Sequence, residues 1–128
     1  MTTVKRPFAP VADKATLVLF RNKGGTGIAL KPSIFLDGEQ LARMQYGRYV
    51  AFTVPAGKHE IAVDFAWNPT VEILTETGKV YYFRLCDPYW RVAWQVSEEE
   101  ALFGLGKLAP IDPDNVKSKD TVAALSPN

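Results

Sequence analysis

A glycine-rich stretch offers the most suggestive spacing for chemistry in this sequence. Residues 22–29, NKGGTGIA, follow an apolar run and come close to a phosphate-binding loop of the form K-G-G-x-G-K-[ST]. Such a loop needs a lysine ammonium on the phosphates and a Ser or Thr hydroxyl on the magnesium ion. Ile28 stands where the lysine should be, and Ala29 stands where the hydroxyl should be. We therefore predict a loop between two strands and no nucleotide binding.

The chain has a single histidine and a single cysteine, the two side chains that most often carry reactive groups. His59 falls on the apolar side of an alternating segment, beside Ile61 and Val63. A hydrogen-bonded structural imidazole is therefore expected there rather than a general base. Cys86 is expected to be a small, partly buried hydrophobe, because no neighbour in the sequence would stabilise a thiolate.

Signatures of metal-dependent and hydrolytic enzymes are missing from the sequence. Asp37, Asp64 and Asp87 are scattered over separate elements, whereas a metal site needs several ligands at helix or hairpin spacing. No G-x-S-x-G, H-E-x-x-H or EF-hand pattern occurs. We predict that the protein is not an enzyme and that it has no cofactor and no metal site.

Composition limits the class of protein and its partners. With 128 residues, of which 47% are hydrophobic and 23% are charged, the chain is expected to be one soluble globular domain. A net charge of +1 supplies no long-range field for nucleic acid or anionic lipid. One cysteine excludes an intrachain disulfide, and no run approaches the roughly 18 apolar residues of a transmembrane helix. The first residues also lack the apolar stretch of a signal peptide.

Period-two alternation and turn residues dominate the chain and predict about seven short strands. The clearest strand is 58–66, KHEIAVDFA, and the apolar run 15–21 is typical of a strand that is covered on both faces. Tight turns are expected at 37–38, 55–57 and 77–78. The other strands are expected at 34–36, 39–43, 48–54, 70–75, 79–85 and 90–96. This order predicts an all-β fold, an antiparallel β-sandwich of the Ig-like or transthyretin-like kind.

One short helix is predicted near residues 97–108, close to the end of the domain. Ser97 with Glu100 three residues later forms a capping box, and Gly104 and Gly106 should keep the helix short. Beyond it the sequence loses its periodicity. The predicted organisation is an N-terminal extension over 1–12, the sandwich over 13–109 and a C-terminal tail over 110–128.

Strand polarity indicates where a binding site would lie. If consecutive strands run up and down, the longer linkers leave the sandwich at the end opposite to the tight turns. Rings in such loops can bind a sugar, a peptide or a partner protein, or they can cap the open end of the core, and both alternatives stay open. The predicted ligand- or partner-binding residues are the aromatic residues at this end, Tyr46, Trp67, Tyr89 and Trp90.

The order of several segments resembles that of a known protein family. These segments are IFLDG at 34–38, YVAFTV at 49–54, PAGKH at 55–59, GKVYYF at 78–83 and VSEEEA at 96–101. They resemble, over roughly residues 13–109, an uncharacterised family of small bacterial β-sandwich domains that is common in predicted lipoproteins. The V-P-x-G-K-H segment is also similar to that of PEGA-type surface repeats. The resemblance implies a cell-envelope location, periplasmic or lipid-anchored, and a non-enzymatic role.

Two functions of different classes follow from these patterns. The favoured one is a cell-envelope scaffold or protein-interaction domain that acts through its loop ends or an exposed sheet edge. The alternative is a carbohydrate- or peptidoglycan-binding module with Trp67, Tyr89 and Trp90 as its stacking platform. The expected partner is accordingly a protein or an envelope glycan, and not a nucleic acid or a nucleotide.

Overall fold

A computed structural model describes residues 8–22, 31–64, 70–85 and 93–118. In these parts the chain forms nine strands, one α-helix and one short 3-10 helix. The strands are β1 (Ala15–Phe20), β2 (Ser33–Leu36), β3 (Glu39–Arg43), β4 (Arg48–Val54), β5 (Gly57–Val63), β6 (Thr70–Thr75), β7 (Val80–Leu85), β8 (Ala93–Val96) and β9 (Ala109–Pro110). The helices are α1 (Glu98–Leu105) and η1 (Pro113–Asn115).

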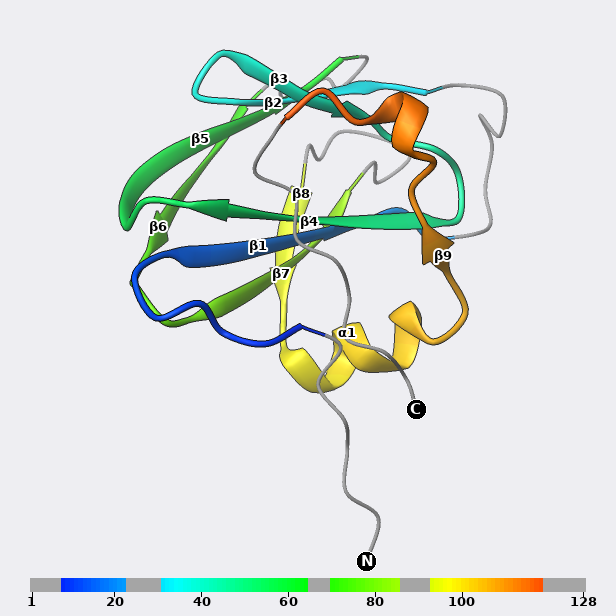
Figure 1. Ribbon diagram of the computed structural model, residues 1–128. Helices are drawn as coiled ribbons and strands as arrows, with labels where there is room; N and C mark the ends of the chain where they lie inside the picture. Colours follow the sequence, from blue (N-terminus) through cyan, green and yellow to red (C-terminus); the bar gives the residue numbers. More distant parts are fainter. Residues whose placement is uncertain (1–7, 23–30, 65–69, 86–92, 119–128) are drawn as a thin grey trace, which may run out of the picture.

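The strands form two sheets that face each other, with α1 as a third layer (Figure 1). The five-stranded sheet has the order β8-β7-β1-β4-β9, and the four-stranded sheet has the order β3-β2-β5-β6. The predicted all-β sandwich is therefore confirmed, with nine described strands in place of about seven. Because the chain passes from one sheet to the other between β4 and β5, the turn at Pro55 joins the two layers.

Two strand pairings are parallel, whereas the sequence predicts an antiparallel sandwich. β1 lies antiparallel to β4 but parallel to β7, with Thr16 opposite Val80. The short β9 is parallel to β4, with Arg48 opposite Ala109. Alternation of direction makes consecutive strands antiparallel, but it does not decide which strands become neighbours in a sheet. β1 and β7 are six strands apart in the chain, so they run in the same direction, and the sheet places them side by side.

The main core fills the space between the two sheets. Alternating residues of β4 and β5 point into it, as the sequence predicts. Strand β1 is buried at all six positions, which confirms that both of its faces are covered. Its odd-numbered residues lie in the core between the sheets, and Val18 and Phe20 lie in a second cluster on the opposite face. The buried residues of the main core include Leu17, Leu19, Val50, Phe52, Val54, Ile61 and Val63.

The second cluster lies between the five-stranded sheet and α1. Ala101 and Leu105 of the helix pack there. The Ser97 hydroxyl accepts a hydrogen bond from the Glu100 amide at 3.1 Å, so the predicted cap is present. The helix ends at Leu105, with Gly106 as its C-cap, and is shorter than the predicted 97–108. Phe8 is also buried in this cluster, so the predicted N-terminal extension contributes a residue to the fold.

Residues 109–118 return along the sandwich, although the sequence places most of them in a tail. The Ile111 amide donates to the Tyr49 carbonyl at 2.8 Å, and the Ile111 side chain lies in the main core. Further on, Val116 forms a β-bridge with Ala42, and the amides of Lys117 and Ser118 donate to the Leu41 carbonyl. The folded unit therefore extends to at least residue 118 (Figure 1).

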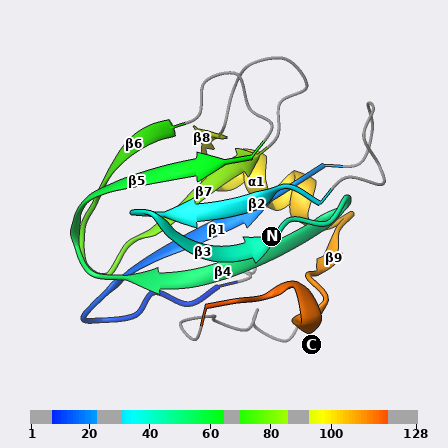
Figure 2. The same ribbon diagram turned by 90° about the horizontal axis from the view of Figure 1, so that it is seen from above.

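The tight turns gather at one end of the sandwich, as strand polarity predicts (Figure 2). Asp37 and Gly38 both have positive φ, 51° and 85°, as a two-residue type I′ turn requires. Gly78 also has a positive φ. The described linker that carries Tyr46 joins β3 to β4 at the opposite end of the strands. No described helix is long and apolar enough to cross a membrane.

Candidate functional site

The structure places one of the four predicted binding residues. Tyr46 lies in the short linker between β3 and β4 and is half-buried. Trp67, Tyr89 and Trp90 lie outside the described residues, as do the glycine-rich loop 23–30 and Cys86. A stacking platform built from these rings therefore stays a prediction of the sequence.

Tyr46 is positioned by an arginine that the sequence analysis did not single out. The Arg21 side chain is buried, and its Nη1 atom donates to the Met44 carbonyl at 3.0 Å. Its guanidinium carbon lies 5.8 Å from the centre of the Tyr46 ring, a distance at which a cation–π attraction contributes. The one feature of the sequence that points to Arg21 is that a basic residue directly follows a buried strand. Arg21 thus holds the linker through the Met44 carbonyl, and its guanidinium lies near the Tyr46 ring.

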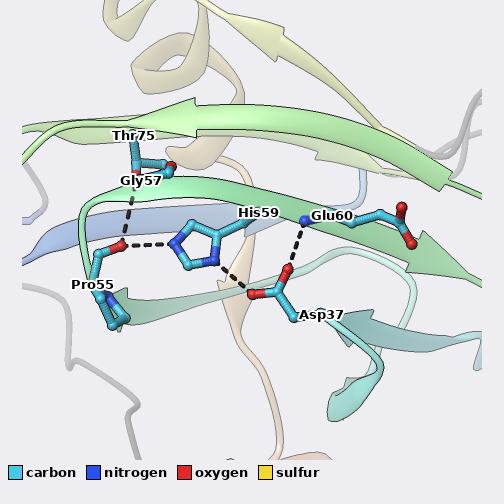
Figure 3. A network of polar contacts seen from close by, with 6 residues as sticks. All are labelled: Asp37, Pro55, Gly57, His59, Glu60 and Thr75. Atoms are coloured by element: carbon cyan, nitrogen blue, oxygen red, sulfur yellow. Dashed lines mark hydrogen bonds and ion pairs between the residues drawn. The ribbon is translucent and has the colours of Figure 1, made fainter.

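At the opposite end, the lone histidine joins three segments through polar contacts (Figure 3). His59 Nδ1 lies 2.6 Å from Asp37 Oδ2, and His59 Nε2 lies 2.7 Å from the Pro55 carbonyl oxygen. The second carboxylate oxygen of Asp37 accepts from the Glu60 amide at 2.8 Å. The Thr75 hydroxyl donates to the Pro55 and Gly57 carbonyls at 3.4 and 3.1 Å. We call these residues, Asp37, Pro55, His59, Glu60 and Thr75, the His59 cluster.

Asp37 and His59, whose side chains contact each other in the His59 cluster, shift each other's pKa. Burial by itself would lower the pKa of His59, but hydrogen bonds to Asp37 and the Pro55 carbonyl and the Asp37 charge raise it above 6.5. Burial would raise the pKa of Asp37, but hydrogen bonds from His59 and the Glu60 amide, together with the His59 charge, lower it below 3.8. The His59 side chain is only 10% exposed and that of Asp37 is 50% exposed, so solvent screens the pair from one side.

The described residues contain no group of three or more His, Cys, Asp or Glu side chains that could hold a metal ion. Two further ion pairs lie on the surface. Lys58 pairs with Glu72 at 2.8 Å across β5 and β6, and Lys79 pairs with Glu76 in the turn before β7. Exposed pairs of this kind contribute little to stability, so they mark a solvated surface rather than a site.

Strand β6 forms the outer edge of the four-stranded sheet. It pairs with β5 on one side over Thr70–Thr75, and no described strand pairs with its other side. Ile73 and Thr75 are buried, whereas Leu74 between them is 73% exposed. Leu74 and Phe103 of α1 are the exposed large hydrophobic residues of the described chain. An edge strand with an exposed apolar side chain is a template for pairing with another chain.

The other sheet edges are shorter or covered. β9 has two residues and β8 has four. β3 has five, but Val116 bridges to Ala42 and two amides of the following residues bind the Leu41 carbonyl. β6, with six residues, is therefore the longest edge available among the described strands.

Comparison with known proteins identifies a family and no characterised relative. A family model described as "Protein of unknown function (DUF2846)" matches residues 11–89. These residues run from before β1 to beyond β7, so the match covers most of both sheets. No curated protein and no solved structure matches the chain.

Proposed function

The chain belongs to this family of proteins of unknown function, and we propose that it is a non-enzymatic protein-interaction domain of the cell envelope. In this proposal a partner protein adds an extended segment to the outer edge of β6. The observation that carries the proposal is the long β6 edge with Leu74 exposed beside it. The envelope location rests on the resemblance of the sequence to domains of predicted lipoproteins.

The chemistry of the β6 edge favours an extended peptide over other ligands. Backbone amides and carbonyls along a strand edge supply affinity, and side chains next to the edge select the sequence that binds. Leu74 would contact an apolar side chain of the added strand, while Glu72 and Lys58 are already paired with each other. Burying a leucine side chain contributes about 1.5–3 kcal/mol. Leu74 would therefore be the main apolar anchor of the described edge.

The arrangement of His59 supports a non-enzymatic role. A general base needs a ring nitrogen that can accept a proton from a substrate. Both ring nitrogens of His59 lie within hydrogen-bond distance of protein oxygens, Asp37 Oδ2 and the Pro55 carbonyl. The imidazole is therefore engaged by the fold on both sides.

The experiment compares two exposed hydrophobic positions on different elements. A photoreactive amino acid replaces Leu74 in one variant and Phe103 in another, and both proteins are irradiated in the cells that produce them. Phe103 is the matched control, because it is 76% exposed but lies on α1. We expect a single partner protein to be crosslinked to the variant at position 74 and not to the variant at position 103.

Direct binding of the captured protein then decides the proposal. Leu74→Lys places a charge beside the edge and should weaken the purified complex about tenfold or more, since the lost leucine contact contributes more than about 1.4 kcal/mol. Phe103→Lys should bind like the parent. Equal crosslinking from both positions, or equal affinity of Leu74→Lys and the parent, would refute binding at β6. Co-sedimentation with peptidoglycan that a Trp67→Ala, Tyr89→Ala double variant abolishes would favour the carbohydrate-binding alternative instead.

A further inference from the structure

The two contacts of the His59 ring determine where its protons lie. A carbonyl oxygen can only accept a hydrogen bond, so the contact to Pro55 at 2.7 Å requires a proton on Nε2. The contact between Nδ1 and Asp37 Oδ2 at 2.6 Å requires another proton between these atoms. Aspartate ionises near pH 3.9 and histidine near pH 6.5, so this second proton resides on the ring and the carboxylate carries the charge.

We propose that His59 is a doubly protonated imidazolium that fastens the turns at one end of the sandwich, and that loss of one proton releases them. As pH rises the ring loses one of the two protons that complete these contacts. A neutral ring still has one N–H, which can serve either Asp37 or Pro55 but not both. The other contact then brings a nitrogen lone pair against an oxygen and must open. The fold therefore contains a pH-sensitive switch, which does not depend on the proposed binding at β6.

The position of the switch gives it structural consequences. Asp37 lies in the turn between β2 and β3, and Pro55 lies in the turn by which the chain crosses between the sheets. The amide of Asp37 donates to the Glu60 carbonyl at 2.8 Å, and Asp37 Oδ1 accepts from the Glu60 amide. Pro55 also accepts from the Thr75 hydroxyl at the end of β6. One proton thus links two turns and the end of the edge strand (Figure 3).

Asp37 supplies the charge that faces His59, because its Oδ2 atom lies 2.6 Å from Nδ1 of the ring. Other charged side chains on the surrounding elements are partnered elsewhere or exposed. Lys58 pairs with Glu72, and Glu76 pairs with Lys79, on strands and turns around the ring. The Glu39 and Glu60 side chains are exposed.

The signs of the two shifts define the pH range of the switch. The pKa of His59 is raised above 6.5, so its contribution is fully present below 6.5 and is lost as pH rises through the folded-state pKa. The pKa of Asp37 is lowered below 3.8, so its contribution is present above 3.8 and is lost as pH falls through the folded-state pKa. The contacts are therefore strongest between these limits.

The test is a direct titration of the ring by proton NMR, which is unambiguous because the chain has one histidine. We expect the C2 proton of His59 to titrate with a midpoint above 6.5 in the parent. In Asp37→Asn the midpoint should fall below the parent value, and asparagine keeps the size of the side chain and tolerates the positive φ of this position. Glu39→Gln is the matched control, because it removes a charge from the next strand without touching the ring, and it should titrate like the parent.

Hydrogen exchange of the unmodified protein tests the release itself and needs no variant. The Glu60 amide, in the middle of β5, donates to Asp37 Oδ1, and the Asp64 amide, just beyond the end of β5, donates to the Ser33 carbonyl at 3.1 Å. After correction for the intrinsic exchange rate, protection of Glu60 should fall above the His59 midpoint while protection of Asp64 stays constant. A parent midpoint at or below 6.5, an unchanged midpoint in Asp37→Asn, or parallel changes of both amides would overturn the proposal.

Discussion

Replacing Ile111 with alanine tests whether the segment after α1 belongs to the folded core. Ile111 is 8% exposed and lies in the cluster between the sheets, although the sequence places it in a tail. The substitution removes three buried carbon atoms, which contribute about 0.8 kcal/mol each. The cavity left behind adds to this loss, but a site at the margin of the core can partly collapse. We therefore expect the free energy of unfolding to fall by about 2–3 kcal/mol.

Urea denaturation followed by tryptophan fluorescence measures this loss. For a domain of this size the slope with urea is about 1–3 kcal/mol per molar, so the midpoint should fall by about 1 M. Leu74→Ala is the control, because it removes the same number of carbon atoms from a side chain that is 73% exposed. Its midpoint should stay close to that of the parent, since exposed substitutions usually change stability by less than about 0.5 kcal/mol. Equal midpoints for Ile111→Ala and Leu74→Ala would show that residues 109–118 do not stabilise the sandwich.

Two further substitutions test the local geometry. Ser97→Ala removes the hydroxyl that accepts from the Glu100 amide and should lower the free energy of unfolding by about 1 kcal/mol in the same assay, whereas Ser97→Asp should retain the parent value. Gly38→Ala should lower it by about 1–2 kcal/mol because φ is 85° there, and since no atom lies within 4 Å of the added carbon, an unchanged midpoint would refute a type I′ turn.

Much of the sandwich follows from the sequence because alternation and turn chemistry act over a few residues. Alternation in β4 and β5 places Val50, Phe52 and Ile61 in the core, and Asp37-Gly38 can supply the two positive φ angles of a type I′ turn. The parallel contact between β1 and β7 is different in kind. It joins strands that lie far apart in the chain, and only packing of the whole sandwich decides which strands become neighbours.

The segment after α1 escaped prediction because its interactions are individually short. β9 has two residues, and Ile111 is an isolated apolar residue among prolines and aspartates. Periodicity needs several turns or strand repeats to be recognised, and this segment offers none. Its position is set instead by backbone contacts such as that from the Ile111 amide to the Tyr49 carbonyl.

The candidate sites were predictable only in part, for a similar reason. Alternation indicates that His59 points inward near a strand end, and an inward imidazole needs hydrogen-bond partners. The identity of these partners depends on which turns adjoin that end: Asp37 lies in the β2–β3 hairpin, whereas Pro55 lies in the turn that crosses between the sheets. Likewise, Arg21 becomes the partner of Tyr46 because the folded chain brings the linker after β3 beside the end of β1. Sequence patterns therefore identify the residue that needs a partner more readily than the partner itself.

The His59 cluster and the β6 edge meet at one atom, the Pro55 carbonyl oxygen. It accepts from His59 Nε2 and from the hydroxyl of Thr75, the last residue of β6. Leu74, the proposed apolar anchor, directly precedes Thr75 in the strand. If the neutral ring keeps its N–H toward Asp37, Pro55 loses one of its two donors and the end of β6 becomes less constrained. A less ordered strand loses more conformational entropy when a partner segment adds to it, and this loss weakens binding. If both proposals hold, affinity at β6 should therefore weaken as pH rises through the His59 midpoint, and a pH-independent affinity would separate the switch from the binding edge.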